Sequence, residues 1–124
     1  MSGRDPSLDN LLFLDGYVAV VDREARYWIK FEVKQVAPSP NKPHGLDYSL
    51  TLHGPDSGDP NDSRLIGFDN AHAVAGKGRS RRPGWDHKHR LRTVQPYDYQ
   101  DAATLLGDFY EAAERMLDER GVKR

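Results

Sequence analysis

Two segments of this sequence alternate apolar and polar residues, and that period of two limits the possible folds more than any other feature. In residues 27–34, YWIKFEVK has a large apolar side chain at every odd position. In residues 46–53, LDYSLTLH has one at every even position. Because successive side chains of a β-strand point to opposite faces, both segments are predicted to be strands with one buried face.

Other short segments extend the predicted sheet. Residues 17–21 form an apolar run, and residues 64–70 carry Leu65, Ile66 and Phe68 ahead of the sequence DN. A further strand is predicted in DHKHRLRTV. The proline- and glycine-rich stretches APSPNKPHG and GPDSGDPNDS interrupt the pattern and are predicted to be loops. We therefore expect four or five antiparallel strands.

The last predicted element is an amphipathic helix, whose apolar residues recur with the i, i+3, i+4, i+7 spacing of one helix face. These residues are Ala102, Leu105, Leu106, Phe109, Ala113, Met116 and Leu117. Asp98 is predicted to cap the N-terminus, Asp101 to lie in the first turn, and Gly121 to end the helix. The expected fold is α+β, a curved antiparallel sheet with this C-terminal helix packed on one face.

Chain length and composition fit one domain. The 124 residues include no cysteine, which excludes disulfides and thiolate metal sites. Residues 1–10 are predicted to be a loose leader and residues 11–124 a single α+β domain, with a basic loop at residues 73–85. No stretch has the layout of a signal peptide or the length of a membrane span. We therefore expect a soluble, cytoplasmic protein that does not associate with membranes.

Charge is distributed unevenly along the chain. Residues 76–92 carry seven basic side chains and one acidic one, whereas the rest of the chain has eleven basic and eighteen acidic residues. A concentrated positive segment on an acidic body attracts a polyanion or an acidic protein, although it can also be a solvated loop that only maintains solubility. The residues predicted to contact nucleic acid are Lys77, Arg79, Arg81, Arg82, Trp85, Lys88 and Arg90.

Two histidine-containing motifs flank this basic segment, FDNAH before it and WDHKH near its end. If the ends of the two strands are neighbours in space, their acids and imidazoles form one cluster. Its predicted members are Asp69, His72, Asp86, His87 and His89. Histidine exchanges protons near neutral pH, so the cluster suits metal-independent RNA cleavage with His72 and either His87 or His89 as the acid–base pair. Arg or Lys would stabilise the phosphorane charge, and the hypothesis needs no cofactor.

Three alternatives stay open from the residues. His72, His87 and His89 could bind a metal ion together with one carboxylate, which would make the protein a metal-dependent hydrolase. The basic segment 76–92 could serve a non-catalytic module that binds nucleic acid or an acidic protein. Each histidine could also be only the satisfied hydrogen-bond partner of a nearby aspartate.

Three aromatic residues outside the motifs receive lesser roles. His44 follows a proline and His53 ends a predicted strand, so both are predicted to be surface residues. Trp28 lies on the polar side of its strand, which indicates a second core or contact with a partner, such as a second copy of the chain in a homodimer.

The order of these motifs resembles the TumE family, small toxins of bacterial and archaeal toxin–antitoxin pairs. The resemblance covers roughly residues 26–118, in HGLDYSLTLHG, LIGFDNAHAV, WDHKHR and DAATLLGDFYEAAERML. Its most distinctive parts are the Asp-Asn-Ala-His run at 69–72 and the Asp-His-Lys-His run at 86–89. The basic spacer between them departs from relatives in which it is often shorter, so the resemblance supports no role for residues 77–82. It implies a DNA-binding antitoxin that binds and neutralises this protein, and it supplies no catalytic mechanism.

Overall fold

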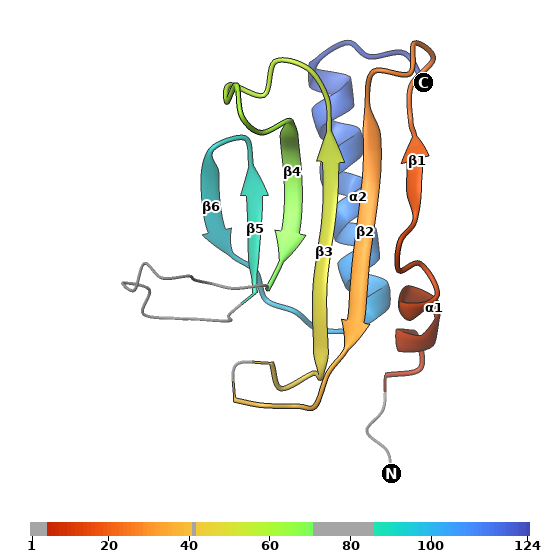
Figure 1. The fold of residues 1–124 in the computed structure, drawn as a ribbon, viewed down its shortest axis with the longest axis vertical. Helices are drawn as coiled ribbons and strands as arrows, with labels where there is room; N and C mark the ends of the chain where they lie inside the picture. Colours follow the sequence, from red (N-terminus) through yellow and green to blue (C-terminus); the bar gives the residue numbers. More distant parts are fainter. Residues whose placement is uncertain (1–4, 41, 71–85) are drawn as a thin grey trace.

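A computed structural model describes residues 5–40, 42–70 and 86–124. These residues form a six-stranded sheet and two helices (Figure 1). The elements in chain order are α1 Leu8–Leu12, β1 Val18–Val20, β2 Trp28–Gln35, β3 Leu46–His53, β4 Arg64–Asp69, β5 His87–Arg90, β6 Thr93–Pro96 and α2 Ala102–Glu119.

The strands follow one another across the sheet in sequence order, and every neighbouring pair is antiparallel. The expected α+β class, antiparallel sheet and C-terminal helix are confirmed, with one or two strands more than predicted. The difference arises in DHKHRLRTV, which folds as the hairpin of β5 and β6 instead of one strand. Leu91 adopts a left-handed φ of 55° at the turn, and its side chain packs against the core.

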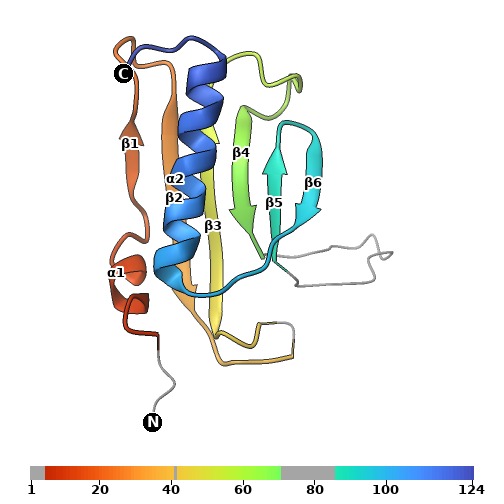
Figure 2. The same ribbon diagram turned by 180° about the vertical axis from the view of Figure 1, so that it is seen from behind.

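The core lies between α2 and one face of the sheet. Figure 2 shows the helix lying along the strands, with the β5–β6 hairpin to one side of it. Phe31 of β2 and Phe109 of α2 meet edge to face, with ring centroids 5.3 Å apart, at the centre of this layer. All seven predicted apolar helix residues contribute, six of them fully buried and Leu106 partly buried. No described helix lies on the opposite sheet face, here called the open face, which is the face seen in Figure 1.

The segment preceding the sheet differs from the expected loose leader over residues 5–10. Leu8 of α1 is buried, and the side chains before it bind the N-terminus of α2. Asp5 Oδ2 accepts a hydrogen bond from the backbone N–H of Ala102, at 2.6 Å, and Ser7 Oγ accepts one from Ala103, at 2.9 Å. The first N–H groups of a helix have no partner within the helix, so these contacts anchor the segment.

The N-cap of α2 also differs from the prediction. Asp101, not Asp98, is the cap, and its Oδ1 accepts a hydrogen bond from the N–H of Thr104 at 2.7 Å. Both aspartates precede an apolar repeat, so the spacing of acidic residues did not distinguish them. Gly121 follows the helix with a left-handed φ of 68°, as expected for the end of a helix.

Candidate functional site

The pairing of β4 with β5 places three titratable side chains in a row on the open face. Asp69 pairs with His87, and Gly67 pairs with His89. Side chains two residues apart on a strand share a face, so His87 and His89 lie on the same side of β5. Their ring centroids are 5.8 Å apart. We call Asp69, His87 and His89 the histidine row.

His89 is the most constrained member of the row. Its Nε2 atom lies 2.9 Å from Oδ2 of Asp69, and the two side chains are only 11% and 13% exposed. The Nε2–H of His89 is not well aligned with the oxygen, so the two groups are in close polar contact without a regular hydrogen bond. Nη2 of Arg64 donates to Nδ1 of His89 over 3.3 Å, which leaves the ring proton on Nε2.

The environment favours an ionised Asp69 beside a neutral His87. Burial acts to raise the pKa of Asp69. Contact with His89 and the positive charges that His87 and Arg64 carry in the acidic range where Asp69 titrates outweigh burial, so the pKa of Asp69 lies below its usual value. Burial lowers the pKa of His87, and the negative charge of Asp69 opposes that shift only in part. At neutral pH His87 is therefore an unprotonated ring able to accept a proton.

Gly67 makes room for the two side chains that meet above it. A Cβ atom at this position would lie 3.0 Å from Cδ of Arg64 and 3.6 Å from Cδ2 of His89. The Arg64 side chain therefore extends over Gly67 of the same strand to reach the imidazole of His89 on β5. Its Nε atom is buried and has no hydrogen-bond partner among the described residues. A buried unpaired donor is costly, which marks this position as one that can gain from an anionic acceptor.

Asp86 contacts a different set of residues from the histidine row. The hydroxyl of Tyr48 donates to Oδ2 of Asp86 at 2.7 Å, and Nε2 of His44 lies 3.1 Å from the same oxygen. Nδ1 of His44 accepts from the N–H of Leu46, so Nε2 carries the ring proton and donates to Asp86. Burial and the Asp86 charge raise the pKa of Tyr48, which keeps its hydroxyl protonated. The predicted surface position of His44 is wrong, because its side chain is only 12% exposed.

Asn70 of the Asp-Asn-Ala-His run has a structural role. It is fully buried and bridges backbone groups of β3. Its Oδ1 accepts from the N–H of Tyr48 at 3.0 Å, and its Nδ2 donates to the carbonyl of Leu46 at 2.7 Å. These bonds hold the end of β4 against the start of β3, and so fix the position of Asp69.

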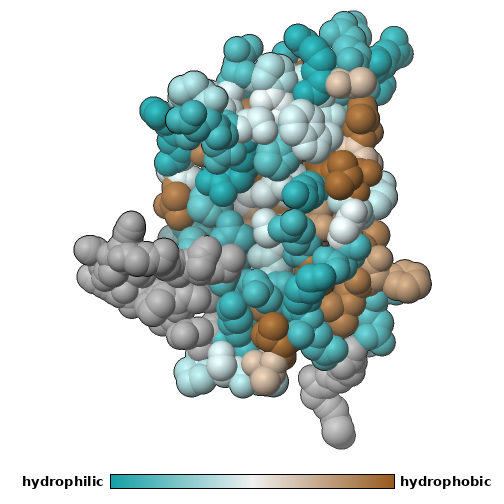
Figure 3. Space-filling model, in the orientation of Figure 1, coloured by the Kyte–Doolittle hydropathy of each residue, from teal (hydrophilic) through white to brown (hydrophobic). Residues whose placement is uncertain are grey.

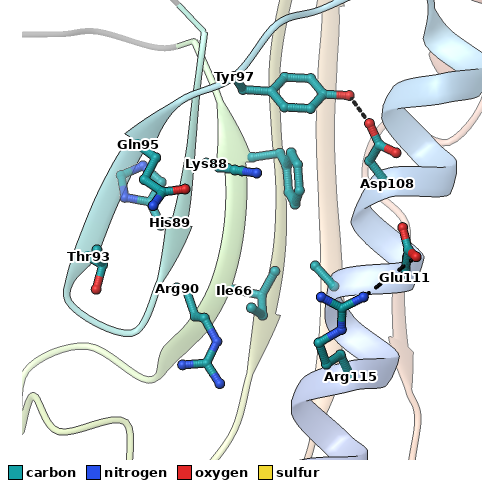
Figure 4. A pocket seen from close by; sticks show the side chains of 12 residues that line it. Ile66, Lys88, His89, Arg90, Thr93, Gln95, Tyr97, Asp108, Glu111 and Arg115 are labelled. Carbon is teal, nitrogen blue, oxygen red and sulfur yellow. Dashed lines mark hydrogen bonds and ion pairs between the residues drawn. The ribbon is translucent and has the colours of Figure 1, made fainter.

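Two residues predicted to bind nucleic acid lie in a groove beside α2. Lys88 and Arg90 alternate with the histidines along β5, and Figure 4 shows both between the strand and the helix. The groove encloses about 390 Å³, with Phe68 and Ile66 among its lining residues. Arg90 also forms an ion pair with Glu119 of α2. These two cations therefore cannot contact the same phosphate as His87 and His89 without reaching around the strand.

The other predicted site residues lie outside the described part of the chain. They are His72, Lys77, Arg79, Arg81, Arg82 and Trp85. Within the described ranges, no group of three histidine, aspartate or glutamate side chains is arranged to hold a metal ion. The metal hypothesis included His72, so it is not tested by this finding.

A family model described as Toxin TumE matches residues 17–117, which include the histidine row, Asn70 and Asp86. The chain belongs to the TumE family. No curated protein and no solved structure matches it.

Membership makes this TumE protein the toxin component of a toxin–antitoxin system, which implies an antitoxin partner. None of its described helices is long and apolar enough to cross a membrane. Arg64, His44 and Tyr48 were not predicted as neighbours of the motif residues. The period-two pattern gave no indication of the position of Arg64. His44 and Tyr48 precede Asp86 by 42 and 38 residues, so no local pattern connects them to it.

Proposed function

We propose that this TumE toxin cleaves RNA without a metal ion, using the histidine row as its acid–base machinery. The observation that carries the proposal is the arrangement of Asp69, His89 and His87 side by side on a sheet face that no described helix covers. Two imidazoles at this separation can act on two oxygens of one phosphodiester, one as base and one as acid.

His87 is the proposed base. Its ring is half-buried and its pKa is lowered by burial, so it is neutral and can take the proton from a ribose 2′-hydroxyl. The 2′-oxygen then forms a bond to phosphorus, and the bond from phosphorus to the 5′-oxygen breaks. A proton passes to that leaving oxygen from the acid, so the products are a 2′,3′-cyclic phosphate and a 5′-hydroxyl.

His89 is the proposed acid among the described residues. Asp69 holds the Nε2–H side of its ring, which leaves Nδ1 as the atom that is available to the leaving oxygen. Arg64 now occupies Nδ1, but its guanidinium is attracted to a bound phosphate and can move to it. Arg64 would then stabilise the phosphorane charge and release Nδ1 of His89. The freed Nδ1 takes up a proton from solvent before the reaction, the Asp69 carboxylate stabilises the imidazolium so formed, and Nδ1 passes this proton to the leaving oxygen. His72 stays a further prediction for the acid, because it lies outside the described residues.

The basic segment between the two motifs is included in the proposal because of its charge. Residues 71–85 connect Asn70 to Asp86, and both of these lie at the ends of the strands that carry the histidine row. We infer that Lys77, Arg79, Arg81 and Arg82 contact RNA phosphates and that Trp85 stacks on a base. We also infer that the antitoxin is a DNA-binding protein and that the pair acts in the cytoplasm.

The test is cleavage of a defined RNA by purified protein in the presence of a chelator. The variant His87→Gln removes the base, and we expect cleavage to fall by about 10²–10⁴-fold. His53→Gln is the matched control, because His53 shares the open face but contacts Ser63 and Thr51 instead of the row. We expect the control to cleave at the wild-type rate, and both proteins to leave a cyclic phosphate wherever they cut.

A second experiment separates catalysis from binding in cells. Wild type and the His87→Ala, His89→Ala double variant are induced side by side, and growth and total RNA are followed. Growth arrest with fragmented RNA in the wild type only is the expected result. Equal arrest with intact RNA in both would contradict the proposal and favour a toxin that acts by binding. Loss of cleavage in chelator, restored by one divalent ion, would instead favour a metal-dependent hydrolase.

A further inference from the structure

The outer edge of β1 is unusually apolar for an exposed strand. β1 is an outermost strand of the sheet, and Val18 and Val20 are 59% and 57% exposed. Phe13, in the turn leading to β1, is 88% exposed. Figure 3 shows hydrophobic residues gathered along the edge formed by β1 and α1. Exposed edge strands usually carry a charge or a proline that prevents pairing, and the sequence GYVAVV at residues 16–21 has neither.

The backbone of β1 presents hydrogen-bonding groups to that edge. The N–H of Val21 donates to the carbonyl of Tyr27, and the carbonyl of Tyr17 accepts from the N–H of Phe31. Along an antiparallel strand the direction of these groups alternates. Odd-numbered residues therefore bond to β2, and Val18 and Val20 direct their N–H and C=O groups outward.

We propose that two copies of this chain pair through β1 as an antiparallel dimer with a two-fold axis at Ala19. In that register Val18 of each copy lies opposite Val20 of the other. Both residues direct backbone groups outward, so each pairing makes two N–H···O=C hydrogen bonds. The same register brings exposed valines of the two copies together on the open face, where cross-strand apolar pairs are stabilising. Isologous pairing of this kind needs a segment that is complementary to itself, and β1 satisfies that condition.

The other outer strand lacks these properties. β6 ends in Pro96, which has no backbone N–H, and Arg92 adds a charge immediately before it. Both features block strand addition. Because β1 can pair with itself in this register, we favour a second copy of the chain over an unrelated strand as the partner of this edge.

The proposed dimer leaves the histidine row accessible. A two-fold axis perpendicular to the sheet keeps the open faces of both copies on the same side of a continuous twelve-stranded sheet, twice the six strands of one chain. The histidines of the two copies, which lie on β5, would be nine strand spacings apart, on the order of 40 Å. The inference does not rest on RNA cleavage, and it can fail or hold independently of it.

The experiment is light scattering coupled to size-exclusion chromatography of the full chain over a wide concentration range. We expect the wild-type mass to rise from one chain toward two, because a three-residue strand gives a modest interface. The variant Val18→Lys, Val20→Lys places charges opposite each other across the axis, and we expect it to remain monomeric at every concentration. Val94→Lys, at a residue of β6 that is 56% exposed, is the matched control and should dimerise like wild type.

Two results would overturn the inference. One is a wild-type mass of one chain at all concentrations. The other is a dimer that persists in the Val18→Lys, Val20→Lys variant, which would place the interface elsewhere. Circular dichroism of each variant establishes that its fold is retained, and a single Val20→Lys variant replaces the double variant if the latter does not fold.

Discussion

The hydroxyl oxygen of Tyr48 lies 2.7 Å from Oδ2 of Asp86, the residue immediately before His87. Tyr48 belongs to β3 and is only 1% exposed, so this bond connects the protein core directly to the start of β5. His44 contacts the same carboxylate from the loop before β3. The position of His87 thus depends on a contact with a distant part of the chain, because Tyr48 precedes Asp86 by 38 residues.

Removing this anchor is expected to destabilise the fold. Tyr48→Phe leaves the buried Asp86 carboxylate without one donor, and we expect the free energy of unfolding to fall by about 1–3 kcal/mol. Urea denaturation of the two proteins measures the difference. Tyr17→Phe removes a hydroxyl from a ring that is 43% exposed and should change stability by less than about 0.5 kcal/mol. Equal effects at the two positions would contradict the anchor.

The sheet and helix could be predicted because their patterns are local. Residues 46–53 are the clearest case, since their alternation gave the bounds of β3 without error. The β5–β6 hairpin could not be predicted, because its turn uses Leu91 in a left-handed conformation with no glycine or asparagine to signal it. That conformation is stabilised by packing of Leu91 on the core, which a single segment does not reveal.

The candidate site was predicted in part, and the missing part depends on a bulge. His87, His89 and Asp69 follow from strand alternation. Strict alternation also places Arg64 on the face opposite Asp69, yet the register between β3 and β4 shifts after Leu52. The extra residue rotates Arg64 onto the open face beside His89. His44 and Asp86 are joined only by the tertiary fold, so no spacing in the sequence indicated their contact.

Asn70 is expected to be essential for stability and not for chemistry. Asn70→Ala leaves the N–H of Tyr48 and the carbonyl of Leu46 without their side-chain partner, and we expect a loss of about 2 kcal/mol or more. Thermal or urea unfolding gives the value. Asn61→Ala, at an exposed loop position, is the control and should be near neutral. An Asn70→Ala protein of wild-type stability that no longer cleaves RNA would show that the amide has a catalytic role instead.

The pH dependence of cleavage should report the lowered pKa of His87. A base is active only when unprotonated, so activity is lost as pH falls through its pKa. Because burial lowers the pKa of His87, the acid limb of kcat/KM should have its midpoint below the usual histidine value of 6.5. Asp69→Asn removes a negative charge that acts to raise this pKa, so its acid limb should move to still lower pH. A midpoint at or above 6.5 in the wild type would exclude His87 as the base.

Gly67 provides a way to separate stability from activity at the site. The methyl group of Gly67→Ala would approach Cδ of Arg64 to 3.0 Å, so the flexible Arg64 side chain must move away from His89. We expect stability to change little, since only a flexible side chain is displaced. Cleavage should fall by about tenfold or more, because Arg64 no longer lies where it can reach the bound phosphate.

The matched control for this substitution is Gly107→Ala. Gly107 lies in α2, where an added Cβ would meet nothing within 4 Å. Alanine favours a helix over glycine by about 1 kcal/mol, so this variant should be more stable and should cleave at the wild-type rate. Urea unfolding and initial rates are measured on both variants. If Gly67→Ala kept full activity, the position that Arg64 holds over Gly67 would have no part in catalysis. If Gly67→Ala lost activity only in proportion to the loss of folded protein, Gly67 would be needed for folding alone. The activity of the histidine row would then not depend on the position of the Arg64 side chain over Gly67.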